Sequence, residues 1–302
     1  MLLKTLDNGT IRLVTQPDHA AVSGYMAAHW GNEEFSKLGY FDNSSEPEQL
    51  AAETIFGIAE HDNGWWEWEA SPLVSASDKL PKGLTEVLSI PEQGAQRWRI
   101  GIRRFEESHP YASLLINFHA YWLYRAQQGE VDEKFLHPLF RGKPYVINEE
   151  SRPVVSSLIE TLNQQQKDLK QRLEKLEGWQ KDAIQPSNLQ PHVKMLQTLD
   201  AISLSLCSDL LPPLSGETKG LGRDEVEFLD IPRRNWDDRV TLEFHPLGEG
   251  RIECNPYPFD EDNLVVPVVV TDLKDDTPNE VHQIREYRVP KKIVTFTFQR
   301  SK

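Results

Sequence analysis

Five side chains that could bind a metal ion occupy positions where a helix would normally place apolar residues. His61 and Asp62 continue the inward face of the second predicted helix, and His119 lies among the apolar residues of the fourth. Asp200 interrupts the leucine stripe of the last predicted helix, and His19 lies in the first turn of the first. Imidazoles and carboxylates together suit hard or borderline divalent cations, so we expect one or two ions of Mn, Fe, Zn, Co or Mg.

Each of these residues has a simpler explanation when it is taken alone. A single histidine such as His119 on an apolar helix face is often an ordinary core residue. Asp200 could cap a neighbouring loop or pair with an arginine, because a buried carboxylate without a partner is costly. The five residues together, each on an inward face or at a helix end, favour a metal site. His109, just before a proline at a helix start, is either a further ligand or a capping or surface residue.

Arginines cluster in the segment that precedes the His119 helix. Arg97, Arg103 and Arg104 are candidates for substrate binding, because guanidinium groups match the geometry of phosphate with paired hydrogen bonds. The alternative is a solvent-exposed helix face whose charges balance neighbouring glutamates. With the metal site, this cluster favours chemistry on a phosphate group.

A run of aromatic and acidic residues directly follows the His61-Asp62 pair. Trp65 could form one wall of a substrate pocket, and Glu67 or Glu69 could act as a general acid or base. The alternative is a loop whose large aromatic rings pack against the core.

Helical periodicity extends from residue 15 to about residue 212. We expect helices that begin at Pro17, Pro47, Pro91, Ser108, residue 152 and near Pro191. The helix over 152–178 is polar except for a narrow leucine stripe, which would pack within the domain or form a homodimer.

The two ends of the chain show the patterns of β-structure. Asn8-Gly9 predicts a hairpin within residues 1–14, and alternating or β-branched segments predict strands over 240–244, 251–254, 264–270, 284–289 and 293–298. We therefore divide the chain into a hairpin (1–14), a helical metal-binding domain (15–212), a linker (213–235) and a β-rich element (236–302). The predicted fold is mainly α, with a small sheet that the N-terminal hairpin joins.

Composition excludes several classes of function. The chain has 302 residues and a formal charge of −14, which disfavours binding to nucleic-acid polymers and to anionic membranes. No apolar run approaches the length of a membrane helix, and two cysteines are too few for a disulfide framework. We expect a cytoplasmic protein that acts on a small molecule.

The order of the candidate ligands resembles the HD-domain superfamily of metal-dependent phosphohydrolases. A histidine, then a His-Asp pair near a helix end, then a distant aspartate correspond here to His19, His61, Asp62 and Asp200. The surrounding segments, such as 16–20 and 59–65, are similar to an uncharacterised bacterial family, a domain of unknown function with HD-like motifs. The resemblance implies an HD-like helical bundle over about residues 15–212. It departs from the minimal pattern in the long interval before His61 and in the additional His119.

The resemblance and the arginines together predict a metal-dependent phosphohydrolase that acts on a small phosphorylated metabolite or nucleotide. The resemblance implies that Asp62 or Asp200 helps to orient an attacking water. Two alternatives remain open. One is an HD-type di-iron oxygenase, which the additional His119 favours, and the other is a non-catalytic helical scaffold with a structural metal.

Overall fold

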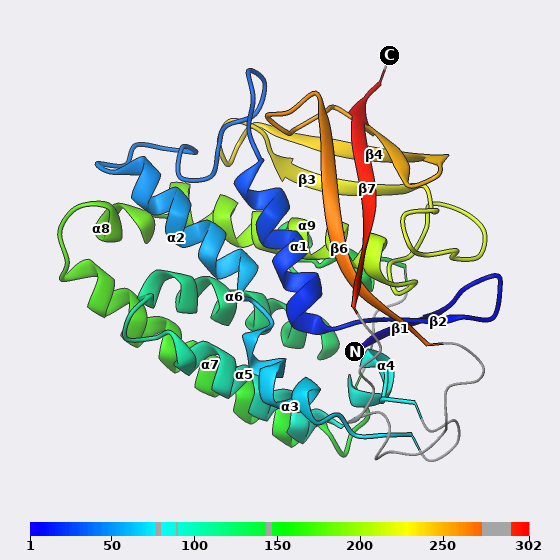
Figure 1. The fold of residues 1–302 in the computed structure, drawn as a ribbon. Helices are drawn as coiled ribbons and strands as arrows, with labels where there is room; N and C mark the ends of the chain where they lie inside the picture. The colour runs from blue at the N-terminus through cyan, green and yellow to red at the C-terminus, as the bar shows by residue number, and fades with distance from the viewer. Residues whose placement is uncertain (76–79, 89, 143–146, 274–290, 302) are drawn as a thin grey trace.

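A group of helices packs against one face of a strongly curled sheet in the computed structural model (Figure 1). The structure describes residues 1–75, 80–88, 90–142, 147–273 and 291–301. Its helices are α1 (Gln16–Ala28), α2 (Pro47–Ala59), α3 (Trp66–Ala70), α4 (Leu84–Leu88), α5 (Pro91–Arg104), α6 (Pro110–Gln127), α7 (Arg152–Glu174), α8 (Trp179–Ala183) and α9 (Pro186–Cys207). Short 3-10 helices are η1 (Asn63–Trp65), η2 (Glu133–Phe135) and η3 (Pro138–Phe140).

The sheet combines strands from both ends of the chain. Within the described residues it has seven strands in the order β1-β2-β6-β7-β5-β4-β3. All neighbouring pairs are antiparallel except β5 and β7, which are parallel. In Figure 1, β6 and β7 cross β3 and β4 at a steep angle, as expected for a strongly twisted sheet. The strands are β1 (Leu2–Thr5), β2 (Ile11–Val14), β3 (Val226–Pro232), β4 (Arg239–Gly248), β5 (Arg251–Asn255), β6 (Asn263–Leu273) and β7 (Lys292–Arg300).

The N-terminal hairpin extends this sheet. Gly9 adopts a φ of 81°, a left-handed conformation that glycine tolerates, so the chain reverses between β1 and β2. Strand β2 then pairs with β6, with Ile11 opposite Leu273. The first and last parts of the described chain therefore lie side by side.

The expectation of a mainly α protein, an HD-like helical bundle with a small β element, is wrong. Helices account for 46% and strands for 20% of the structure as described, and the mixed, curled sheet forms half of a barrel. The sequence pattern underestimated the sheet because strand pairing joins distant segments, which no local periodicity reveals. Strand β3 lies within residues 213–235, where a linker was expected. The expected strand over 284–289 lies outside the described residues, and the division into domains stays a prediction.

The long polar helix α7 packs against α6 within the same chain. Its leucine stripe is buried over most of its length, at Leu158, Leu162, Leu169 and Leu173, whereas Leu176 is exposed. Most of this stripe therefore packs within the chain, and the homodimer stays a prediction.

Helix α9 lies between the other helices and the sheet, and almost all of its residues are buried. It begins at Pro186, so Pro191, which was expected to begin the helix, lies inside it. Because α9 is surrounded on all sides, polar residues such as Asp200 on it must find buried partners. Across the described ranges, no helix is long and apolar enough to cross a membrane.

Candidate metal centre

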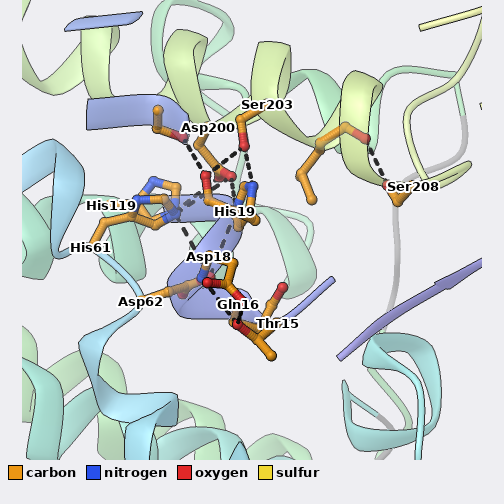
Figure 2. Close-up of polar contacts among 12 residues, drawn as sticks. Thr15, Gln16, Asp18, His19, His61, Asp62, His119, Asp200, Ser203 and Ser208 are labelled. Carbon is orange, nitrogen blue, oxygen red and sulfur yellow. Dashed lines mark hydrogen bonds and ion pairs between the residues drawn. The ribbon is translucent and has the colours of Figure 1, made fainter. Parts of the chain in front are cut away.

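Four helical segments bring the five predicted ligands to one buried point (Figure 2). His19 comes from α1, His119 from α6 and Asp200 from α9, whereas His61 and Asp62 lie in the turn that follows α2. Each of the five is at most 6% exposed. Thr15 caps α1 by accepting a hydrogen bond from the backbone N–H of Asp18, which starts the helix one turn before His19.

The contacts of the cluster centre on Asp200. Its Oδ1 lies 3.0 Å from His19 Nε2 and 3.5 Å from His61 Nε2, and its Oδ2 lies 3.3 Å from His119 Nε2. Asp62 Oδ2 lies 3.7 Å from Nε2 of both His19 and His61. The two carboxylates therefore contact the same pair of imidazoles.

These distances match the spacing of ligand atoms around one ion. Nitrogen and oxygen atoms bound tetrahedrally at about 2.1 Å lie roughly 3.4 Å apart. The ligand atoms of His19, His61 and Asp200 all lie within 4.8 Å of one another and form a possible metal site. Within the described part of the chain, His61 Nε2 is buried and has no hydrogen-bond partner of normal geometry. A buried nitrogen that lies near two carboxylates without hydrogen-bonding to them is consistent with a metal ligand.

Hydrogen bonds at the outer side of the rings set the tautomers of two imidazoles. His61 Nδ1 contacts the carbonyl oxygen of Ile58 at 2.8 Å, and a carbonyl only accepts, so this nitrogen carries the proton. His19 Nδ1 contacts Ser203 Oγ, which itself donates to the carbonyl oxygen of His19 at 2.9 Å, so the same holds for His19. In the neutral rings, both Nε2 lone pairs therefore face the possible metal site, the arrangement of metal-binding histidines.

A sixth residue, His137, joins the cluster and was not predicted. It precedes η3, and its Nε2 lies 3.0 Å from Asp200 Oδ2. Its Nδ1 accepts the backbone N–H of Leu139 at 3.1 Å, so in the neutral ring the proton is on Nε2. His137 Nε2 therefore lies close to Asp200, but among the described residues it has no hydrogen-bond partner of normal geometry. The available signal was a histidine between Leu136 and Pro138 in an otherwise apolar segment.

Burial and opposite charges shift the pKa values of the cluster. Burial opposes ionisation of Asp200, but the charge on His61 and the contacts of three further imidazoles hold its pKa well below the usual range. Burial also disfavours the charged form of His61, yet Asp62 and Asp200 outweigh it and raise its pKa to about 9. The two carboxylates therefore stabilise a positive charge at this point.

A cavity of about 70 Å³ is lined both by residues of the cluster and by Arg97. Arg97 is 5% exposed, and its guanidinium lies over the rings of Trp65 at 4.2 Å and Trp68 at 4.6 Å. Its Nη2 donates to Gln93, but its Nε and Nη1 have no hydrogen-bond partner among the described residues. Burial lowers the pKa of Arg97 to about 10. A buried guanidinium with two unpartnered donors could bind an anion.

The other predicted substrate and acid-base residues on this side lie elsewhere. Arg104 pairs with Glu67 at 2.7 Å and lies over Trp66, while Arg103 is exposed. None of Arg103, Arg104 and Glu67 is among the described residues that line the cavity. Of the predicted substrate-binding residues, Arg97 and Trp65 therefore line the cavity. Arg103 and Arg104 lie on the outer face of α5 instead.

Glu69 and His109 also have partners outside the cluster. Glu69 accepts the backbone N–H of Gln16 at 2.7 Å and lies 2.7 Å from the amino group of Met1. His109 Nδ1 contacts Glu53 at 2.9 Å. Both residues therefore connect segments of the fold, and the candidate site contains neither.

A helical layer, a half-barrel sheet and a buried His/Asp cluster beside a small cavity define a protein with a possible metal site. The chain belongs to the family described as "Protein of unknown function (DUF3891)", which matches residues 1–275. The predicted similarity to an uncharacterised family is confirmed to this extent. No curated protein and no solved structure matches the chain. Membership of the HD-domain superfamily stays a prediction.

Proposed function

We propose that this protein is a metal-dependent phosphohydrolase. The observation that carries the proposal is one cavity lined by both the His/Asp cluster and Arg97. A cation and a guanidinium on two sides of a small cavity provide the charges that a phosphoryl group needs. Apolar and aromatic walls strengthen both interactions because they exclude water.

The residues present fit a divalent cation held by His19, His61, Asp62 and Asp200. Such a cation would activate water for attack and polarise a phosphoryl oxygen. We propose one ion, because the ligand atoms of His19, His61 and Asp200 form one group within 4.8 Å of one another. Mn, Fe, Zn, Co and Mg all remain candidates for this donor set.

The chain's own residues would position the substrate and the water. Arg97 would bind the phosphoryl group through its guanidinium, whose Nη1 has no hydrogen-bond partner among the described residues, and the Trp65 and Trp68 rings hold the guanidinium in place. Asp62, which lines the cavity beside His19, would orient the attacking water and accept its proton. His119 would act as a neutral imidazole at pH 7, since burial lowers its pKa to about 4.

Metal analysis and kinetics test this proposal together. We expect purified protein to bind one divalent ion per chain and to hydrolyse phosphomonoesters with Mn, Co or Mg added. Asp200→Asn should lose the metal and the activity. Arg97→Gln should keep the metal but lower kcat/KM roughly 10- to 100-fold, because it removes charge-assisted hydrogen bonds to phosphate.

Arg103→Gln is the matched control, because it changes an exposed arginine on the same helix. Its kcat/KM should equal that of the wild type. Circular dichroism of each variant shows whether the fold is kept. A folded protein that binds none of these ions and cleaves no phosphomonoester would exclude the proposal.

A di-iron oxygenase is the second candidate, and one observation favours it. His119 and His137 flank Asp200 Oδ2 and offer two further nitrogens beside the first site. Two irons per chain together with oxygen consumption would support this chemistry. A single redox-inert ion would count against it.

A further inference from the structure

The cavity beside the cluster has a volume of about 70 Å³. The walls are large side chains on helices and 3-10 turns, including Trp98, Leu123, Leu139 and Phe140.

The cavity also contains a hydrogen-bond acceptor without a partner. Gln16 is 3% exposed and lines the cavity, and its Oε1 has no hydrogen-bond partner in the part of the structure that is described. Gln16 precedes His19 by one turn of α1, so both side chains lie on the same face of the helix. Figure 2 shows Gln16 beside Asp62 and below His19.

The start of α1 holds Gln16 in this position. Its backbone N–H donates to Glu69 Oε2 at 2.7 Å, and the neighbouring Thr15 is the N-cap of the helix. A buried carboxamide oxygen without a donor is costly, and a ligand that supplies a donor removes that cost. The site thus offers donors at Arg97 and an acceptor at Gln16.

We infer that the substrate is a small phosphomonoester with a hydroxyl or ammonium group near the phosphate, and that Gln16 recognises this donor. The inference rests on the proposed function for the cleavage step. It adds that Gln16 determines specificity. Arg97 binds the phosphate end and Gln16 the donor end of the same molecule.

Two probes isolate the donor group: 2-hydroxyethyl phosphate and ethyl phosphate. We expect calorimetry to show the hydroxyethyl ester binding roughly tenfold more tightly than the ethyl ester, the difference of one hydrogen bond to a buried group. The kcat/KM values should follow the same order.

Gln16→Leu should remove the preference by weakening the hydroxyethyl ester roughly tenfold, with ethyl phosphate unchanged. Gln96→Leu, an exposed glutamine on α5, is the matched control and should keep the preference. Circular dichroism checks the fold of each variant.

Failure of this inference is distinguishable from failure of the proposed function. Selective binding of the hydroxyethyl ester without hydrolysis by any metal-loaded form keeps the inference and overturns the phosphohydrolase. A preference that survives Gln16→Leu overturns the inference. Failure of either small ester to bind also overturns it.

Discussion

At the scale of single residues, the cluster depends on contacts that surround the ligands as much as on the ligands. Ser203 illustrates this, because its Oγ contacts His19 Nδ1 and donates to the carbonyl oxygen of His19. The serine therefore orients the ring and selects the tautomer whose Nε2 faces Asp200. Ser203 lies one helical turn from Asp200 on α9, so a single helix positions one proposed ligand directly and another through a hydrogen bond.

Replacing this serine tests its role as a positioning residue. Ser203→Ala should leave a buried N–H of His19 without an acceptor and cost about 1–3 kcal/mol of folding free energy. The affinity for Mn or Zn should fall about 10- to 100-fold, because the ring is no longer held. Calorimetric metal titration measures the affinity, and urea unfolding measures the stability.

Ser205→Ala is the control for this prediction. Ser205 Oγ donates to the carbonyl oxygen of Ile202 at 2.6 Å and contacts no residue of the cluster in the described structure. Its metal affinity should match the wild type. Equal metal affinities in the two variants would show that Ser203 only stabilises the helix.

Helical periodicity predicted five residues of the cluster, because each lies on an inward helix face or at a helix end. His137 and Gln16 were missed as site residues for a different reason. His137 lies outside the long helices, and its approach to Asp200 is a long-range contact that no spacing encodes. Among the arginines, composition could not separate Arg97 from Arg103, since only packing buries one and exposes the other.

At the scale of elements, the distance between α1 and α2 sets the distance between the proposed ligands that they carry. Gly24 on α1 packs directly on Ala59 of α2, and a Cβ at position 24 would lie 2.4 Å from the Ala59 Cβ. Gly57 brings α2 close to Ala112 of α6 in the same way, with a corresponding distance of 3.3 Å. Small residues thus bring His19, His61 and His119 together on three closely packed helices.

Gly24→Ala should separate these helices. In an unhindered helix this change would stabilise by about 1 kcal/mol, but the overlap with Ala59 should cost more and give a net loss of roughly 1–2 kcal/mol. The metal affinity should fall with it, because His19 moves away from His61. Urea unfolding and metal titration measure the two effects.

Ala21→Leu provides the comparison, because Ala21 is on the exposed face of α1. Ala21→Leu adds more volume than Gly24→Ala, but the added atoms face solvent. Stability and metal affinity should therefore stay near those of the wild type. A Gly24→Ala protein as stable as the wild type would show that α1 can move without cost.

At the scale of the whole molecule, the helices and the sheet share one core. One buried apolar cluster includes Met26 of α1, Leu199 of α9 and Phe244 of β4. Lys194, only 4% exposed, also lies on α9, between charged residues of the sheet and neighbouring loops. Burial lowers its pKa to about 8, although Asp230 partly opposes this shift.

The shift of Lys194 predicts a pH dependence of stability. Between the folded pKa of about 8 and the unfolded value of 10.5, the unfolded chain binds more protons, so this lysine's contribution to the free energy of unfolding rises with pH. Lys194→Met should therefore stabilise the protein by on the order of 2 kcal/mol at pH 7. The gain should shrink towards zero above pH 10.5, where the lysine is neutral in both states.

Guanidinium chloride unfolding at pH 7 and near pH 10.5 measures this difference. The exposed Lys167 on α7 is the control, and Lys167→Met should give no pH-dependent gain. A loss of stability in Lys194→Met at pH 7 would show that the charged lysine has a stabilising partner in the folded protein.

The sequence by itself determined which helices carry polar residues on their inward faces, because helical periodicity is a local property of the chain. It also indicated the hairpin turn at Asn8-Gly9 and most strands of the C-terminal part. Only the tertiary structure decided how far the sheet extends, since β2 pairs with β6 across most of the chain. It also decided that Arg97, Gln16 and His137 share one small cavity with the cluster, because burial and convergence depend on long-range packing.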